Sequence, residues 1–163
     1  MEGNASKIYF KAYFEDIGWN SRKPRAKIDE LNSLLDIGYT FLFNFIESNL
    51  KIYGFDVYNG FYHRFFYQRK SLVCDLVEPF RCLVDKAVRD AFHLKKFNKE
   101  DFIQKNHQYI LRINKNKKYT EVLFKDILEN RDEIFLFIRD YYRFIMKEKS
   151  LEQFPVFAVK KQC

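Results

Sequence analysis

Residues 71–92 read SLVCDLVEPFRCLVDKAVRDAF, and this stretch decides the fold class. Apolar residues recur in it at every third or fourth position, which is the spacing of one buried face of an α-helix. They are Leu72, Leu76, Phe80, Leu83, Ala87 and Ala91. Pro79 has no N–H to donate to the carbonyl of Asp75, four residues earlier. We therefore predict a helix from Ser71 to about Phe92 that kinks or begins late at the proline.

Helical spacing continues on the N-terminal side of this stretch. Asp29 can cap a long helix that ends near Tyr53, before Gly54. Its predicted buried stripe is Leu31, Leu34, Leu35, Gly38, Leu42, Phe45 and Ile46. A short amphipathic helix over 3–15 is indicated by Ala5, Ile8, Tyr9, Ala12 and Tyr13. Residues 18–27 and 54–70 lack a sustained period, so we predict loops there.

The C-terminal side is also mainly helical. YILRI, residues 109–113, is a candidate short strand, and KNKK at 115–118 is a predicted turn. Helices follow over 119–129 and 131–148, and the last ten residues form a tail. The sequence thus predicts a mainly α fold, a single helical domain over 1–163. It would hold about five to seven helices, with room for one short β-hairpin.

Composition excludes several classes of protein. Of the 163 residues, 47% are hydrophobic and 19% are aromatic, which is too apolar for a disordered chain. No stretch has the roughly 18 to 20 consecutive apolar residues that span a bilayer. The N-terminus lacks a signal-peptide pattern, and the three cysteines fit no zinc spacing. We expect a cytoplasmic protein without a membrane partner.

The formal net charge of +7 suggests a polyanionic partner. Two basic loops are candidates for contacts to DNA phosphates: Arg22, Lys23 and Arg25 in the first, and Arg64, Arg69 and Lys70 in the second. A third basic region covers residues 95–118. The aromatic residues 65–67 in the second loop are expected to belong to the core.

Asp75, Glu78 and His63 are the candidate site. A separation of three residues places Asp75 and Glu78 on one side of a helix, where both carboxylates can reach one ion. Arg81 can hold Glu78 in place or meet a phosphate. Carboxylates with an imidazole suit Mg²⁺ or Mn²⁺. The alternative is a loop histidine beside two solvated helix charges.

Four ordered motifs resemble the Cas1 family of CRISPR-associated spacer-acquisition integrases. Gly60 and His63 match its G-x-x-H loop, and residues 71–85 match a helix reading roughly S-L-V-x-D-L-x-E-x-F-R-x-x-V-D. Residues 2–10 and LNSLLDIGY, 31–39, resemble two further helices of the family. Tyr58 replaces a usual proline, although the spacing to the histidine is intact. The resemblance runs from residue 2 to about residue 90.

The resemblance implies a metal-dependent DNA integrase and endonuclease with a helical catalytic domain. Its metal ligands would be Glu2, His63 and Glu78, with Asp75 at a second acidic position close to the metal. The implied partners are double-stranded DNA, a second copy in a homo-oligomer such as a dimer, and a second CRISPR acquisition protein. Family members usually carry an N-terminal β-rich domain before the first of these motifs. A non-catalytic DNA-binding or scaffold domain is the alternative, and a plain helical interaction module is a third.

Overall fold

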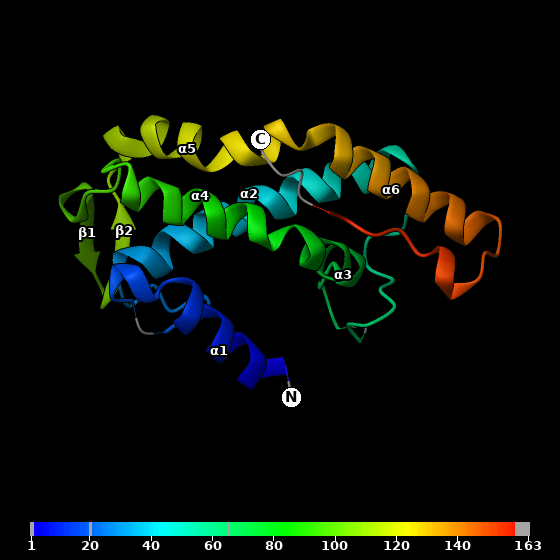
Figure 1. Cartoon of the computed structure of the whole chain (residues 1–163), viewed down its shortest axis with the longest axis horizontal. Coiled ribbons are helices and arrows are strands. Elements are labelled where there is room, and N and C mark those ends of the chain that lie inside the picture. The colour runs from blue at the N-terminus through cyan, green and yellow to red at the C-terminus, as the bar shows by residue number, and fades with distance from the viewer. Residues whose placement is uncertain (1, 20, 65, 159–163) are drawn as a thin grey trace.

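The structure is a computed structural model that describes residues 2–19, 21–64 and 66–158; for Glu2 only the backbone is described. The fold is mainly α, as the sequence predicts (Figure 1). The α-helices are α1 (Glu2–Tyr13), α2 (Glu30–Ile52), α3 (Ser71–Val77), α4 (Arg81–His93), α5 (Asn116–Glu129) and α6 (Arg131–Met146). Strands β1 (Phe102–Lys105) and β2 (Gln108–Leu111) form an antiparallel hairpin.

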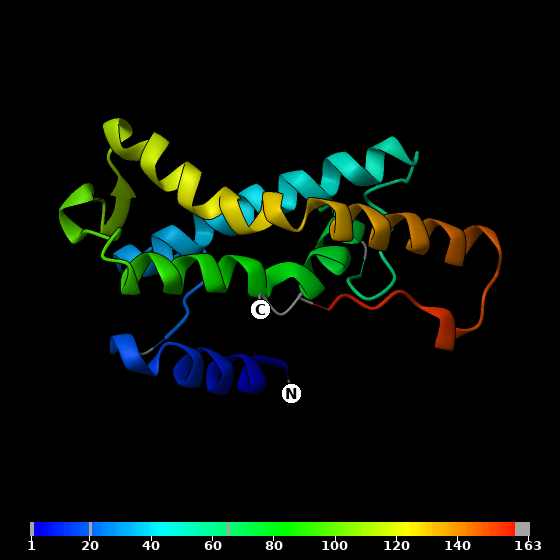
Figure 2. The same ribbon diagram turned by 45° about the horizontal axis from the view of Figure 1, so that its top comes forward.

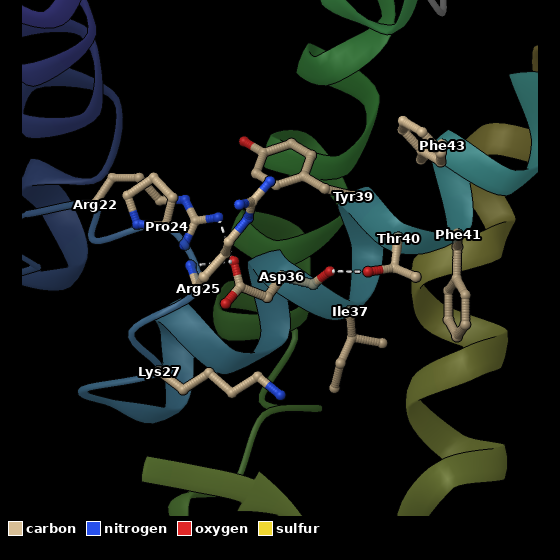
Figure 3. A pocket seen from close by; sticks show the side chains of 10 residues that line it. All are labelled: Arg22, Pro24, Arg25, Lys27, Asp36, Ile37, Tyr39, Thr40, Phe41 and Phe43. Carbon is tan, nitrogen blue, oxygen red and sulfur yellow. Dashed lines mark hydrogen bonds and ion pairs between the residues drawn. The ribbon is translucent and has the colours of Figure 1, made fainter. Parts of the chain in front are cut away.

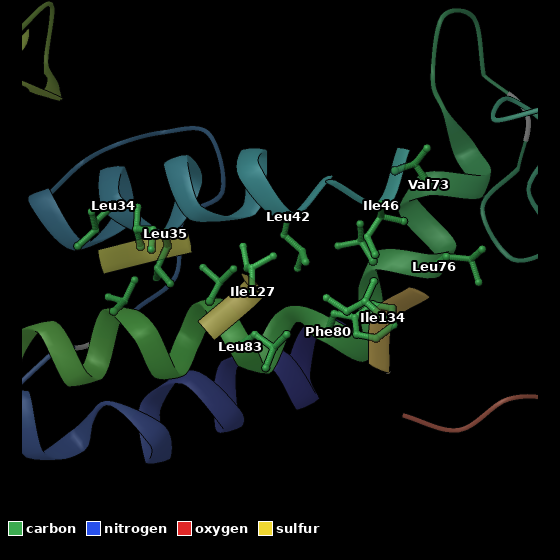
Figure 4. Packing of buried hydrophobic residues seen from close by; sticks show 14 of the residues in the cluster. Leu34, Leu35, Leu42, Ile46, Val73, Leu76, Phe80, Leu83, Ile127 and Ile134 are labelled. Atoms are coloured by element: carbon green, nitrogen blue, oxygen red, sulfur yellow. The ribbon is translucent and has the colours of Figure 1, made fainter. Parts of the chain in front are cut away.

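Helices α2 and α4 run side by side through the centre of the molecule (Figures 1 and 2). Helices α5 and α6 cover one side of this pair, and α1 lies on the other. The core between them is built from leucine, isoleucine and phenylalanine side chains. Leu35 and Leu42 of α2 and Leu83 of α4 are almost fully buried in it, together with Ile127 of α5 and Ile134 of α6 (Figure 4).

The ends of α2 follow the capping signals in the sequence. The side chain of Asp29 accepts a hydrogen bond of 2.6 Å from the backbone N–H of Asn32. This bond satisfies one of the donors that a helix start leaves free. After the helix, Gly54 has φ +74°, a left-handed conformation that favours glycine.

Pro79 interrupts the helix over 71–92 as predicted. The α-helix stops at Val77, a 3₁₀ turn, η2, covers Glu78–Phe80, and α4 resumes at Arg81. The buried side of this segment nevertheless continues through the break, because Leu76, Phe80 and Leu83 are each at most 1% exposed. The proline thus changes the helix path at Glu78 without opening the core.

Three details differ from the sequence prediction. Helix α1 and the residue after it bury Phe10 and Phe14 rather than the stripe that includes Ile8, which is 70% exposed. The predicted KNKK turn is wrong in its last three residues, because α5 already begins at Asn116. The predicted strand over 109–113 is shifted: β2 spans Gln108–Leu111 and pairs with a strand that no pattern had indicated.

The aromatic residues 65–67 also differ from their prediction. Phe66 is 68% exposed and Tyr67 is 78% exposed, so the expectation that they belong to the core is wrong for both. Phe65 lies outside the described residues.

Among the described residues, no helix combines the length and the apolar character that crossing a membrane requires.

Candidate metal and nucleic-acid site

The loop before α3 folds back onto the carboxylate of Asp75. Oδ2 of Asp75 accepts the backbone N–H groups of Phe61 and Tyr62 at 2.7 and 3.0 Å. Oδ1 accepts the backbone N–H of His63 at 2.9 Å and lies 2.5 Å from Nδ1 of its ring. The Asp75 side chain is 0% exposed, so both oxygens are enclosed by these four contacts.

The contacts define the protonation of this pair. Burial disfavours the charge on Asp75, but the donors from Tyr62, His63 and Phe61 outweigh burial and hold the pKa of Asp75 below its usual value. An ionised carboxylate only accepts hydrogen bonds, so Nδ1 of His63 is the donor. In the neutral ring Nε2 then carries no proton. This is the arrangement in which a carboxylate orients a metal-binding histidine.

Gly60 makes the fold-back possible. A Cβ at this position would lie 2.6 Å from Oδ2 of Asp75 and 2.8 Å from Cβ of Ser71. These distances are too short for any side chain, and one of the atoms belongs to the first residue of α3. The glycine of the G-x-x-H pattern is therefore required, because the loop approaches α3 too closely to leave room for a side chain.

Glu78 has a different environment from Asp75, although the two were expected to share an ion. Its side chain is 45% exposed, and both of its oxygens lie 3.1 Å from Nη1 of Arg81. Arg81 also lies over the ring of Tyr39, 4.7 Å from its centroid. Of the two roles predicted for Arg81, the structure shows the one in which it holds Glu78.

Glu78 lines a groove of about 390 Å³ between α1 and the start of α4. Ala5, Ser6 and Tyr9 form the α1 side of this groove. Glu2 is the first residue of α1, but its side chain lies outside the described residues. Among the side chains that are described, no three His, Cys, Asp or Glu groups converge on a point that could hold a metal.

Helix α1 is joined to α4 by a stripe of polar side chains at intervals of four residues. Tyr9 donates a hydrogen bond of 2.9 Å to Asp85. Arg89 pairs with Asp16 at 2.8 Å, and Nε2 of His93 lies 2.9 Å from the same carboxylate. Asp85 is 2% exposed and also accepts a bond from Tyr39 of α2, so one carboxylate joins three helices.

The sequence alone assigned no role to Asp85. No local signal could have found its partners, because Tyr39 and Tyr9 are 46 and 76 residues away along the chain. Burial is the main reason that the pKa of Asp85 is raised, although both tyrosine hydroxyls oppose the shift.

The first basic loop divides into one buried and two exposed cations. Arg22 is only 7% exposed and pairs with Asp36 at 2.5 Å, as Figure 3 shows. It also donates to Oδ1 of Asn32 at 3.0 Å. In this structure Arg22 therefore ties the loop to α2 rather than offering its charge to a phosphate. Lys23 and Arg25 are exposed.

Arg25 and Lys27 line a groove of about 600 Å³ with α2 residues that include Phe41 and Phe43 (Figure 3). In the second loop, Lys70 pairs with Glu47 at 2.8 Å. Arg64 and Arg69 are exposed, and no ion pair to either is present among the described residues. In these two loops, the cations available to a phosphate are thus Lys23, Arg25, Arg64 and Arg69.

Fold and site together define a mainly α protein in which a buried carboxylate orients a loop histidine, near exposed basic loops. A family model described as CRISPR associated protein Cas1 matches residues 1–124. The chain belongs to the Cas1 family.

Relatives in that family are similar over much of this chain. The CRISPR-associated endonuclease Cas1 1 of Thermodesulfovibrio yellowstonii is 32% identical over 159 residues, which cover 93% of this chain and 49% of the relative. The CRISPR-associated endonuclease Cas1 3 of Thermus thermophilus is 38% identical over 106 residues, 62% of this chain and 32% of the relative. The chain thus spans half or less of the length of these curated relatives.

Solved structures share the fold. A casposase bound to integration product superimposes with a TM-score of 0.82 at 21% identity, over 98% of this chain and 51% of the casposase chain. A partial Cas6-RT-Cas1–Cas2 complex gives a TM-score of 0.86 at 22% identity, over 98% of this chain and 52% of that chain. At these identities the likeness concerns the fold alone.

Proposed function

We propose that this chain is the catalytic domain of a metal-dependent DNA integrase and endonuclease that inserts spacer DNA into a CRISPR array by strand transfer. The observation that carries the proposal is the His63–Asp75 pair. A buried carboxylate fixes the ring and its loop, and leaves Nε2 available to coordinate a metal ion. A histidine that served packing alone would not need both its backbone N–H and its ring nitrogen held by one buried carboxylate.

The donor set fits Mg²⁺ or Mn²⁺. His63 would supply Nε2, Glu78 a carboxylate from the groove beside α1, and Glu2 a carboxylate from the start of α1. A bound divalent ion would supply Lewis-acid stabilisation of charge on a phosphoryl oxygen. We assign Asp75 to positioning rather than to ligation, because all of its contacts hold the loop and the ring of His63.

The remaining residues would bind and orient the DNA. Arg81 keeps Glu78 on the groove. If Glu78 turned to a metal ion, Arg81 would be free to bind a phosphate. Lys23, Arg25, Arg64 and Arg69 would meet backbone phosphates, which positions a duplex without reading its sequence. Lys70 could join them only by giving up Glu47, and we exclude Arg22 because it is buried.

The printed names of similar proteins suggest partners. One solved relative is bound to an integration product and others are in a complex with Cas2. By analogy we propose double-stranded DNA, a second copy of the chain and a second acquisition protein as partners. The +7 charge supports the first of these.

A non-catalytic DNA-binding or scaffold role is the second candidate. It is favoured by the ion pair between Glu78 and Arg81 and by the missing three-ligand cluster among the described side chains. In that case the basic loops would act alone, and binding of DNA would not depend on a divalent ion.

Strand transfer of a 3′-hydroxyl DNA end into a target duplex distinguishes the two. We expect activity in Mg²⁺ or Mn²⁺ that His63→Ala and Glu78→Ala abolish, while gel-shift affinity stays within about twofold. Lys125→Ala, on the far surface of α5, is the control and should retain activity. A wild-type chain that binds DNA but transfers no strand in either ion, also when supplied with the acquisition partner, would support the scaffold role.

A further inference from the structure

Tyr39 of α2 contacts both of the charged groups that the first turns of α4 present to it. Its hydroxyl donates a hydrogen bond to Oδ1 of Asp85, and the guanidinium carbon of Arg81 lies 4.7 Å from the centroid of its ring. Burial and the charge of Asp85 raise the pKa of Tyr39, so the hydroxyl keeps its proton and remains the donor. Tyr39 therefore contacts one residue that holds Glu78 and one that holds α1.

Close packing of α2 on α4 brings Tyr39 to this position. The preceding residue is Gly38, where a Cβ would lie 2.5 Å from Cγ1 of Val84. Val84 is fully buried and β-branched, so it cannot turn aside easily. The two helices thus touch at Gly38, and Tyr39 is placed by the packing of two long helices and not by a loop.

A second guanidinium reaches the same ring. The guanidinium carbon of Arg22, in the first basic loop, lies 5.3 Å from the ring centroid of Tyr39, and the carboxylate partner of Arg22 is Asp36 (Figure 3). The ring of Tyr39 is therefore shared by a residue of the first basic loop and by the arginine that holds Glu78.

Glu78 depends on that arginine for its position. The side chain of Glu78 is 45% exposed, and among the described residues Arg81 is the one cation that pairs with it. Fixing a long arginine side chain costs rotamer entropy, so an exposed ion pair alone holds a carboxylate loosely. The cation–π contact with Tyr39 offsets part of this cost and keeps Arg81 in one place.

We propose that Tyr39 is a positioning residue of the candidate site. Its ring keeps Arg81, and through Arg81 the carboxylate of Glu78, at the groove beside α1, whereas its hydroxyl satisfies the buried carboxylate of Asp85. The inference rests on the proposed function for the purpose of this arrangement, which is to present Glu78 to a divalent ion. A tyrosine that served only the packing of α2 on α4 would not need its ring for that purpose.

NMR of the arginine side chains in the metal-free chain tests the ring contact directly. Protons over an aromatic ring are shifted upfield, so the Nε–H signal of Arg81, identified by its loss in Arg81→Lys, should lie upfield in wild type and in Tyr39→Phe. In Tyr39→Leu the signal should move to the position of a solvated arginine. An Arg81 signal that Tyr39→Leu leaves in place overturns the proposal.

Phe43→Leu is the matched control. It removes a ring from the same helix, and no cation–π contact to Phe43 is present in the described part of the chain. The Arg81 signal should not change in this variant. An equal change in Phe43→Leu would mean that any lost ring on α2 disturbs Arg81, and would overturn the specific role of Tyr39.

Mn²⁺ titration by electron paramagnetic resonance tests the consequence for the metal site. Tyr39→Leu should bind Mn²⁺ roughly tenfold more weakly than wild type, and Tyr39→Phe should stay within about threefold of it. Both variants lose the bond to Asp85, so a purely structural role predicts that both weaken binding alike. Equal weakening overturns the proposal. Tighter binding by Tyr39→Leu also overturns it, because Arg81 would then compete with the ion for Glu78.

The two measurements separate this inference from the proposed function. A wild-type chain with the upfield Arg81 signal that binds no Mn²⁺ would keep the positioning of Arg81 by Tyr39, while the proposed metal site fails. A wild-type chain that binds Mn²⁺ but shows no upfield Arg81 signal would keep the metal site and reject the role of Tyr39.

Discussion

At the scale of single residues, Asp75 determines where His63 lies. One carboxylate accepts three consecutive backbone N–H groups and the ring nitrogen, and none of its surface is left for solvent. A neutral side chain of the same shape cannot replace it, because an amide has a single oxygen and adds two donors of its own. The loop and the ring therefore depend on one negative charge.

Asp75→Asn should weaken both the loop and the metal site. Leaving buried donors unpaired costs about 1–3 kcal/mol of the free energy of unfolding, which urea denaturation measures. Loss of a residue that orients a ligand lowers metal affinity roughly 10- to 100-fold, measurable by Mn²⁺ titration with electron paramagnetic resonance. Asp56→Asn is the matched control, since Asp56 accepts only one N–H in the same loop and is exposed. Wild-type Mn²⁺ affinity in Asp75→Asn would refute the assignment.

Gly60→Ala should displace the loop from α3. The added Cβ would meet Asp75 and Ser71 at less than 3 Å, and Ser71 is part of the helix. We expect His63 to lose its fixed position, seen as a changed ring resonance by NMR and as lost strand transfer, while circular dichroism stays helical. Gly3→Ala, which has open space around it, should fold with the same spectrum as wild type. A Gly60→Ala protein with an unchanged His63 resonance contradicts the argument.

The residues of this candidate site could be proposed from the sequence, but the role of each one could not. Asp75 and Glu78 are three residues apart, with Asp75 in α3 and Glu78 at the start of the 3₁₀ turn that contains Pro79. Helical spacing does not reveal that a loop 12 residues upstream returns to cover Asp75, because loop paths are set by hydrogen bonds that leave no periodic pattern. The same limit hid the burial of Arg22, whose partner Asp36 is 14 residues away.

At the scale of elements, α1 depends on polar contacts as well as on packing. Phe10 and Phe14 are buried and contact Trp19. The other links run from α1 and the turn after it to the polar stripe of α4, through Asp85 and Arg89. Figure 2 shows α1 set apart from the other helices along most of its length. Since α1 begins with Glu2, these contacts decide how the proposed third ligand approaches the groove.

Arg89→Ala should loosen α1 selectively. The change removes the ion pair with Asp16 and the contact with the Tyr13 ring, whose centroid is 5.0 Å from the guanidinium carbon. Amide hydrogen exchange should become faster over residues 2–17 and remain unchanged in α2 and α5, because local opening follows local contacts. Arg131→Ala, which removes an exposed pair of 3.5 Å on α6, is the control. Unchanged protection of α1 from hydrogen exchange would show that the packing of Phe10 and Phe14 is enough to hold α1 in place.

The buried carboxylate of Asp85 should give α1 docking a pH dependence. Burial raises the pKa of Asp85 in the folded state above its usual value near 4. The folded protein then binds more protons than the unfolded chain between these two values, so the contribution of Asp85 to stability falls as pH rises through the raised pKa. Asp85→Asn cannot titrate. The free energy of unfolding of wild type minus that of the variant should therefore decrease from pH 4 upward and then level off, as measured in urea. A flat difference would contradict this reasoning.

Elements in which apolar residues recur with a clear period could be predicted from the sequence, and elements without such a pattern could not. The stripe through Leu31, Leu35 and Leu42 predicts α2 because a long helix repeats its apolar face several times. Strand β1 spans only Phe102–Lys105 with one buried residue, so it carries no alternation that a sequence could reveal. Its turn uses positive φ angles at Asn106 and His107 instead of the usual glycine.

At the scale of the whole molecule, the net charge of +7 does not mean that every cation is free to bind a partner. Several cations are already paired within the fold, including Lys86 with Asp126 and Lys118 with Asp101. Among the described residues, exposed cations without an ion pair lie in the loops that precede α2 and α3 and also in the third basic region, residues 95–118. Composition predicts the sign of the partner, whereas only the structure separates the charges that stabilise the fold from those that can meet a phosphate.

Binding of duplex DNA should therefore weaken steeply with salt, and the slope should depend on a few named residues. Each phosphate that a cation neutralises releases counterions, so the logarithm of affinity falls with the logarithm of salt by about 0.9 per contact. Lys23→Gln/Arg25→Gln and Arg64→Gln/Arg69→Gln should each reduce the slope by up to about 1.8. Lys125→Gln/Lys147→Gln removes the same two charges from α5 and the end of α6 and should leave the slope unchanged. If all three double variants shift it equally, net charge alone attracts the DNA, and if wild type shows no slope, phosphates are not its ligand.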